Sequence, residues 1–289
     1  MRLVASPLLS SPMSVDYSAG LSPYANKGLC GQPELYDSKE DFDLNIERLA
    51  TLIRSSTYTV VHTGAGISTS VGIPDFRGPK GVWTLENKGE IPNVDMTFER
   101  ASPSLTHNAL VALEKSNYIH YVITQNVDGL NLRSGFPRNR LSILHGDMFI
   151  DSCTTCRSSY IRKSKPSPTM RQRFTGFMCC RVKRKGIFCR GKLHDTILDW
   201  EDSLPEPDYY LALEHSRRAQ LHICLGTSLQ IFPSANLPIV TAKASNLFAY
   251  SAKRRKLNND VKFNESNAVS SKLEAHHPCM AEHSMDSNG

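Results

Sequence analysis

"VVHTGAGISTSVGIPDFRGP", residues 60–79, is the stretch on which the expected fold depends. It starts as a β-branched run and reaches the closely spaced Gly64 and Gly66, a pattern typical of a buried strand that feeds a phosphate-binding turn. A dinucleotide fingerprint would place a third small residue three positions after Gly66, where this chain has Thr69. The stretch continues with Gly72, Asp75, Phe76 and Arg77. A glycine-rich turn of this kind is as often structural as functional, so its ligand has to be inferred from other segments of the sequence.

Strand-like and helix-like segments alternate around this turn. Ser38 and Asp41 form a capping pattern ahead of a helix, and its apolar positions fall on one face: Phe42, Ile46, Leu49 and Ile53. Short apolar runs at 57–64, 118–126 and 221–228 predict strands, and the stretches 105–117 and 211–219 predict helices. This alternation predicts an α/β fold, a parallel sheet with helices on both faces.

Polar residues stand just past the ends of several expected strands. They are Gln125, Asn126 and Asp128 in "TQNVDG", His145 in "LHGDM", and Gly226, Thr227 and Ser228 in "LGTSLQ". In an open parallel sheet the ligand lies at the carboxyl ends of the strands. We therefore expect these loops to converge with the glycine turn on one crevice. Taken alone, His145 would more often be a satisfied structural histidine.

A group of cysteines marks a segment with a different pattern. Cys153 and Cys156 are separated by two residues, Cys179 follows after 22 more, and Cys189 after a further nine. Two pairs of thiolates joined by a loop fit a tetrahedral structural zinc site. The segment has no long apolar periodicity, so it needs a metal to supply folding free energy. The adjacent Cys180 leaves the third ligand open, with Cys179 preferred, and free buried cysteines are the alternative.

Composition places the chain in the soluble globular class. Its 289 residues suffice for one large domain or two small ones, and they are 40% hydrophobic and 21% charged. No apolar run approaches the length of a membrane span, so we expect no membrane partner. The net charge of +6 is clustered, which suits a polyanion such as DNA or, alternatively, a solvated basic face. "MRLVASPLLSSPM" predicts a disordered leader or a weak transit peptide, with the body starting at Met1 or Met13.

Several ordered segments together resemble the sirtuin family of NAD-dependent protein-lysine deacylases. They are "GAGIS", "GIPDFRG", "TQNVDGL", "LHG", the four-cysteine module and "GTSLQ", and the resemblance covers roughly residues 13–241. It implies a Rossmann-like domain at residues 38–145 and 195–243, with a small zinc-binding domain inserted at 146–194. Outside it we expect a disordered or extended segment over 1–37 and a disordered basic and polar tail over 244–289.

The resemblance also implies roles for individual residues. NAD would be consumed as a co-substrate, with Asn126 and Asp128 holding the nicotinamide carboxamide and His145 acting as general base. Other cofactor contacts would come from Gly64, Ala65, Gly66, Thr69, Asp75, Phe76, Arg77, Trp83, Gln125, Gly226, Thr227 and Ser228. Asp199 and Trp200 would lie beside the acyl-lysine channel. The plainer alternatives are a loop ion pair between Asp75 and Arg77, and core packing for Trp200.

The chain departs from the family pattern after "NLP", residues 236–238. An apolar strand, an Asn-x-Gln turn and the last helices of the family have no counterpart in the polar sequence that follows. We expect an exposed sheet edge, weaker binding of the adenosine end of NAD and lower stability than in a complete homologue. "KRRK" at 253–256 predicts import into the nucleus, or else a basic patch in a tail.

Three functional hypotheses follow from these features. The first is a deacylase that removes acetyl or longer acyl groups from lysines of histone tails and chromatin proteins, releasing nicotinamide and O-acyl-ADP-ribose. The second is a protein mono-ADP-ribosyltransferase, in which a protein side chain captures the same ribose carbon. The third is a truncated, weakly active or inactive module that binds chromatin through zinc and basic residues.

Overall fold

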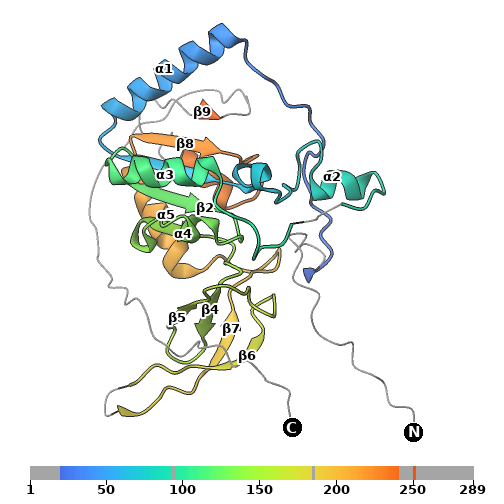
Figure 1. Cartoon of the computed structure of the whole chain (residues 1–289), viewed down its shortest axis with the longest axis vertical. Helices are drawn as coiled ribbons and strands as arrows, with labels where there is room; N and C mark the ends of the chain where they lie inside the picture. The colour runs from blue at the N-terminus through green and yellow to red at the C-terminus, as the bar shows by residue number, and fades with distance from the viewer. Residues whose placement is uncertain (1–19, 93–95, 184–185, 241–249, 252–289) are drawn as a thin grey trace.

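A parallel sheet of five strands forms the centre of the molecule. The computed structural model describes residues 20–92, 96–183, 186–240 and 250–251. The sheet order is β3-β2-β1-β8-β9, and every neighbouring pair is parallel. The strands are β1 Thr59–Thr63, β2 Tyr121–Thr124, β3 Leu141–Ile143, β8 Leu221–Leu225 and β9 Tyr250–Ser251 (Figure 1). The predicted α/β class is confirmed.

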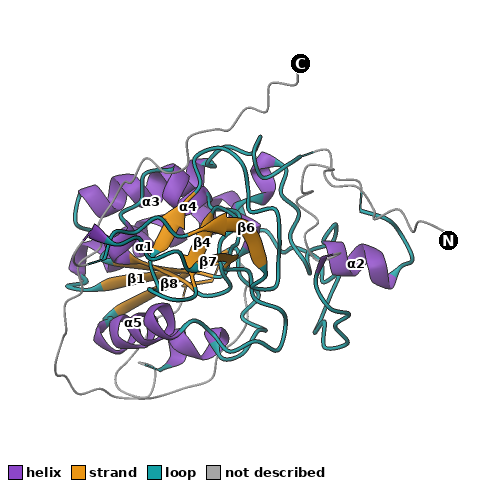
Figure 2. Ribbon diagram, turned by 90° about the horizontal axis from the view of Figure 1, so that it is seen from below, coloured by secondary structure: helices purple, strands orange, loops and turns teal. Residues whose placement is uncertain are grey.

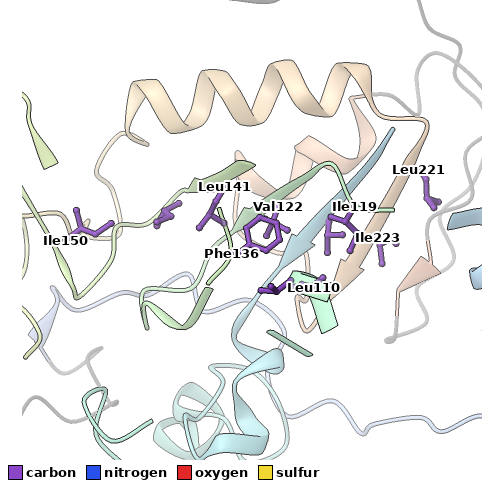
Figure 3. Close-up of a cluster of buried hydrophobic side chains, with 11 residues drawn as sticks. Leu110, Ile119, Val122, Phe136, Leu141, Ile150, Leu221 and Ile223 are labelled. Carbon is purple, nitrogen blue, oxygen red and sulfur yellow. The ribbon is translucent and has the colours of Figure 1, made fainter. Parts of the chain in front are cut away.

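Helices cover both faces of this sheet. Adjacent residues of a strand point to opposite sides, so they pack against different helices. Val61 and Val122 pack with Leu110 of α3, Leu105–Lys115, and with the C-terminal half of α1, Lys39–Ser55. Val60 and Tyr121, one residue earlier on each strand, pack instead against α5, Glu206–Arg218. The view from below shows the strands between these two helix layers (Figure 2), and Figure 3 shows the first cluster.

The first helix follows its predicted start but uses only part of its predicted apolar face. Ser38 is the N-cap, and its side chain accepts a hydrogen bond of 3.1 Å from the Asp41 backbone. Leu49 and Ile53 pack on the core, whereas Phe42 and Ile46 are 53% and 44% exposed. Periodicity identifies a face, but the partner that covers it is decided by tertiary packing.

Short elements connect the sheet strands. The turn after β1 is built from two 3₁₀ segments, and a short α-helix follows it. These and the remaining elements are η2 Ala65–Ile67, η3 Thr69–Val71, α2 Val82–Asn87, α4 Leu130–Arg133, η4 Arg138–Arg140 and η6 Ser234–Ile239. None of the helices in the described ranges is both long and apolar enough to cross a membrane.

The inserted segment forms its own antiparallel sheet of four strands, in the order β5-β4-β7-β6. The strands are β4 Ile150–Cys153, β5 Ser159–Ile161, β6 Phe174–Met178 and β7 Lys192–Asp195. Its buried cluster consists of Cys153, Cys179, Cys189 and Leu193. Three of these four residues are cysteines, so the small sheet has little apolar core of its own, as the sequence predicts.

The predicted tail is described only at two residues. Tyr250 and Ser251 form β9, in parallel register with Ile223 and Cys224 of β8. This pairing lies at the sheet edge where the sequence predicts that a strand is missing. The rest of the tail, the "KRRK" segment at 253–256 and both candidate starts, Met1 and Met13, lie outside the described residues.

Two buried histidines join β1 and β8 at the middle of the sheet. The Nε2 atom of His62 lies 2.8 Å from the Nδ1 atom of His222, and both side chains are buried. Burial lowers the pKa of His222 to about 4 and that of His62 well below its usual value. In the unfolded chain both imidazoles have a pKa near ~6.5. Their neutral forms therefore favour folding above that pH, and the contribution is lost as pH falls toward 4.

We expect the pH dependence of stability to be weaker in His222→Gln than in the wild-type protein. Between pH 7 and pH 5 the wild-type free energy of unfolding should fall by about 2 kcal/mol more than that of the variant, since one depressed imidazole no longer titrates. Urea unfolding at both pH values measures this difference. Parallel losses in the two proteins would contradict it.

Candidate functional site

A cavity of about 500 Å³ opens at the carboxyl ends of the sheet strands. Fourteen of the seventeen predicted cofactor and substrate residues line it: Gly64, Ala65, Asp75, Phe76, Arg77, Gln125, Asn126, Asp128, His145, Asp199, Trp200, Gly226, Thr227 and Ser228. Gly66, Thr69 and Trp83 are outside this lining. The structure thus brings the loops after β1, β2, β3 and β8 together at one place, as expected for an open parallel sheet.

The glycines are required because two neighbouring loops touch through their backbones. The Gly64 N–H donates to the Leu225 carbonyl at 3.0 Å, and the Gly66 N–H donates to the Gly226 carbonyl at 2.9 Å. A Cβ atom on Gly64 would lie 2.7 Å from the Gly226 oxygen, and one on Gly226 would lie 2.5 Å from the Ile67 nitrogen. Gly226 also has a φ of 60°. Gly66 therefore supports the turn from behind rather than lining the cavity.

Asn126 and Asp128 are held in place by the turn after β1. The Asn126 side-chain nitrogen donates to the Gly64 carbonyl at 3.1 Å. The buried Asp128 carboxylate accepts 2.7 Å and 2.8 Å hydrogen bonds from the Ser68 hydroxyl and the Leu130 N–H. Because each side chain is anchored by a second element, an amide and a carboxylate are fixed in orientation within the cavity wall.

His145 lies where the chain passes from the central sheet to the small sheet. Its Nδ1 atom is 3.1 Å from the Gln125 carbonyl, which only accepts, so Nδ1 carries the proton and Nε2 is left as the basic atom. Ser234 places its hydroxyl 3.5 Å from that Nε2. Burial lowers the pKa of His145 to about 4, although the bond to Gln125 acts in the opposite direction. The imidazole is therefore neutral at pH 7 and able to accept a proton.

The glycine that follows His145 is required for a separate structural reason. Gly146 has a φ of 87°, and a Cβ atom there would collide with the Thr196 carbonyl. Leu198 donates its N–H to the His145 carbonyl at 3.2 Å, beside this crossing. The segments that lead into and out of the insertion therefore pass each other beside His145, and a side chain at Gly146 would separate them.

The loop at residues 75–77 is supported from behind by aromatic residues. Trp83 is buried, its ring lies 4.8 Å from that of Phe76, and the Arg77 guanidinium stands 4.5 Å from the Trp83 centroid. Asp75 accepts a 2.9 Å hydrogen bond from the Gly78 N–H, and no ion pair between Asp75 and Arg77 occurs among the described residues. Trp83 thus positions the loop. Thr69 is exposed and donates to the Gly66 carbonyl at 3.1 Å.

The four predicted zinc ligands meet in the small sheet. The sulfur atoms of Cys153, Cys156, Cys179 and Cys189 all lie within 4.8 Å of one another. Two of the separations are 3.8 Å and 3.5 Å, close to the roughly 3.8 Å edge of a tetrahedron with Zn–S bonds of about 2.3 Å. Cys180 is outside the group, with its sulfur 4.0 Å from the Tyr160 hydroxyl. Four thiolates and this spacing fit a structural zinc ion with no open position.

Comparisons with known proteins agree with this geometry. The model of the Sir2 family matches residues 64–101 and 93–233. The chain belongs to the Sir2 family. It is 48% identical to the NAD-dependent protein deacetylase Sirt6 of Drosophila melanogaster, over 82% of this chain and 75% of that protein. It is also 48% identical to the NAD-dependent protein deacetylase SRT1 of Arabidopsis thaliana, over 80% of this chain and 48% of that protein.

A solved Sir2 structure with a p53 peptide and NAD+ is similar in fold. It covers 71% of this chain and 85% of the solved chain, with 29% identity and a TM-score of 0.50. Sirtuins use NAD as a co-substrate, and the residues present in this Sir2-family cavity fit that molecule. Gly64 and Gly226 in its lining expose backbone to a close ligand, and Asn126 and Asp128 beside them offer amide and carboxylate groups.

Sequence reasoning missed the apolar part of this Sir2-family cavity. Residues that line it outside the quoted motifs include Leu21, Phe98, Leu198, Leu204, Tyr209, Ile231 and Phe232. Single apolar residues in loops have no periodicity, so their position cannot be deduced from pattern. Leu21 comes from the predicted extended segment, whose described residues make specific contacts with the cavity wall.

Substitution of Gly226 by alanine should disrupt the cavity, because the new Cβ would meet backbone atoms that cannot move aside. Gly89 is the matched control, since its φ of 73° carries the same strain but a Cβ there meets nothing within 4 Å. Gly89→Ala should cost about 1 kcal/mol, and Gly226→Ala about 2–4 kcal/mol. Denaturant unfolding measures the costs. The thermal shift caused by NAD should disappear only in Gly226→Ala, and equal behaviour of the two variants would count against the argument.

The positions of the sulfur atoms predict different effects for substitution of the adjacent Cys179 and Cys180. Cys179→Ser should abolish zinc binding and expose the small sheet to proteolysis, since metal binding supplies its folding free energy. Cys180→Ser should keep about one zinc per chain. Elemental analysis of the purified proteins distinguishes them. Zinc loss in Cys180→Ser with retention in Cys179→Ser would reverse the assignment.

Proposed function

We propose that this chain is an NAD-dependent protein deacetylase whose substrates are acetylated lysines of histone tails. One observation carries the proposal: a single cavity is lined by the glycine turn, by Asn126 and Asp128, by the basic imidazole of His145, and by Asp199 and Trp200. The named activities of the relatives support it. A cofactor-binding turn, a proton acceptor and a peptide-facing loop are the parts required to transfer an acyl group from lysine to the ADP-ribose part of NAD, with nicotinamide as the leaving group.

Each residue has a definite task in this reaction. NAD supplies an electrophilic ribose carbon when its nicotinamide leaves. Asn126 and Asp128 bind the carboxamide through hydrogen bonds, and Phe76 in the cavity wall keeps water from the reacting centre. His145 accepts a ribose hydroxyl proton at Nε2, because Nδ1 is already committed to the Gln125 carbonyl.

The charge around the cavity favours a basic peptide. Three acidic residues, Asp199, Asp202 and Glu206, line its outer part, and Glu201 belongs to the shallow groove beside it. Asp199 also forms an ion pair with Arg171 at 2.9 Å. Acidic groups at a cleft attract basic ligands and reject acidic ones, which supports histone tails as the substrate class.

The apolar lining favours acyl groups longer than acetyl as additional substrates. Leu204, Tyr209 and Phe232 extend the wall beyond the polar centre, and Phe232 is 70% exposed. An acyl chain that covers such surface gains roughly 0.8 kcal/mol for each buried methylene. Comparing acetylated and longer-chain acylated peptides of one sequence tests this extension, and equal kcat/KM values would exclude it.

The small sheet supports contact with chromatin. Its described part carries many basic residues: Arg157, Arg162, Lys163, Lys165, Arg171, Arg173, Arg181, Lys183, Arg190 and Lys192. Such a set suits the DNA backbone, and binding through it would weaken steeply with salt. We also propose nuclear localisation, which rests on the composition of the "KRRK" segment. Imaging the tagged chain with those residues replaced by alanine tests it; unchanged nuclear accumulation would overturn it.

The decisive test is mass spectrometry of an acetylated histone peptide incubated with NAD. Wild-type protein should remove the acetyl group, and His145→Ala should do so about 10²–10⁴-fold more slowly, because the proton acceptor is gone. His194→Ala, a histidine of β7 outside the cavity lining, is the control and should retain the wild-type rate. Addition of ADP-ribose to the peptide with the acetyl group retained would favour the transferase hypothesis instead. Equal rates for all three proteins would refute the role of His145.

A further inference from the structure

We propose that the segment from Leu21 to Gly31 supports the wall of the cavity, with Ser22 and Tyr24 as positioning residues for the loop at Asp199 and Trp200. Leu21 itself lines the cavity, and Ser22 and Tyr24 line the shallow groove beside it. The catalytic consequence of this arrangement rests on the proposed function; the arrangement itself rests on contacts. The sequence pattern predicts only coil here. In the structure this coil is joined to three separate parts of the cavity.

The first junction is a set of reciprocal hydrogen bonds to the loop after the small sheet. The Ser22 hydroxyl donates to Asp199 Oδ2 at 2.6 Å, and the Ser22 N–H donates to Oδ1 at 3.1 Å. In return, the Trp200 indole N–H donates to the Ser22 carbonyl at 2.8 Å. A hydroxyl donor on a carboxylate is a charge-assisted contact, which is stronger than a neutral one. Both side chains of the loop are therefore held by a single residue.

The second junction is an aromatic cluster formed by Tyr24, Phe76, Trp83 and Trp200. The Tyr24 ring is stacked on Trp200 with centroids 5.2 Å apart and lies 5.8 Å from Trp83. Trp83 and Trp200 are themselves 5.1 Å apart, and Trp83 supports Phe76 at 4.8 Å. Tyr24 thus packs against both tryptophans, which also contact each other, and it links the loop at Trp200 to the helix that supports Phe76.

The third junction involves Arg77 and the loop after β8. The Arg77 Nε donates to the Lys27 carbonyl at 2.7 Å, and the Gly31 N–H donates to the Arg77 carbonyl at 3.0 Å. Leu29 exchanges two hydrogen bonds with the Gln230 side chain, at 2.8 Å and 3.3 Å. A Cβ atom on Gly28 would lie 2.5 Å from Gln230 Oε1, so this junction is a close one.

The charge on Asp199 depends on the same segment. Burial acts to raise its pKa, but hydrogen bonds from Ser22 and Trp200 and the charge of Arg171 together hold the pKa below its usual value. Removing the Ser22 hydroxyl removes the 2.6 Å hydrogen bond to Oδ2 and leaves that oxygen paired with Arg171 at 2.9 Å. The loop then loses the contact that fixes the orientation of Asp199 beside the peptide path, and positioning errors of this kind lower rates without changing the chemistry.

The arrangement has a spectroscopic signature that needs no enzymatic activity. The chain contains two tryptophans, and both belong to the aromatic cluster. Tyr24→Ala should increase quenching of tryptophan fluorescence by acrylamide, since the face of Trp200 becomes open to solvent. Tyr24→Phe retains the ring and should restore the wild-type value. Tyr36→Ala changes a tyrosine that is 84% exposed in the same part of the chain and should have no effect.

Kinetics with an acetylated peptide test the positioning role. Ser22→Ala and Tyr24→Ala should each raise the KM for the peptide about tenfold and leave the KM for NAD within about twofold. The reason is that the loop at Asp199 and Trp200 is the part of the site proposed to contact the peptide. Ser22→Thr keeps the hydroxyl and should recover most of the loss. Zinc content and the thermal midpoint of every variant are measured in parallel.

The outcomes separate this inference from the proposed function. Wild-type protein without deacetylase activity would refute the function, while increased quenching in Tyr24→Ala alone would still support the contact of this segment with the loop at Trp200. Unchanged quenching and unchanged peptide KM in both alanine variants would overturn the inference. Equal losses in Tyr36→Ala, failure of Tyr24→Phe to restore the wild-type values, or a rise of both KM values with a lowered thermal midpoint would also overturn it.

Discussion

The backbone contact between the turn after β1 and the loop after β8 is the constraint on which the cavity depends. Two neighbouring parallel strands end at the same edge, and their loops approach until the Gly66 N–H and the Gly226 carbonyl share a 2.9 Å hydrogen bond. There is no space for a Cβ atom on either side. This approach fixes the Gly64 carbonyl that anchors Asn126, so the orientation of a side chain on a third loop follows from it.

The small sheet is the second support of the site, although it contributes few residues to the cavity. It leaves the central sheet directly after His145 and returns just before Asp199 and Trp200. Its four clustered thiols substitute for the apolar core that it lacks. A zinc ion bound by these thiols would therefore also determine where His145 and the loop at Asp199 and Trp200 stand relative to each other.

Individual residues show why prediction succeeded in some places and failed in others. Asn126, Asp128 and His145 could be predicted because parallel strands place their carboxyl-end loops at one edge. The place of Trp83 behind the loop could not be predicted from order alone, because whether a ring lines a cavity or supports the loop that does so depends on which side of the loop it packs. Phe42 illustrates the same limit, since helical periodicity gives a face but not its partner.

The sequence by itself determined the α/β class, the alternation of strands and helices, the glycine turn and the candidate thiols of a metal site. Those features depend on residue types and on their spacing along the chain, which are visible without a three-dimensional structure. Only the tertiary structure decided that Leu21 lines the cavity, that Ser22 and Tyr24 contact the loop at Asp199 and Trp200, that Cys179 rather than Cys180 joins the sulfur group, and that β9 stands beside β8. Those contacts join residues far apart along the chain, and no local pattern records which distant surfaces a coil segment will meet.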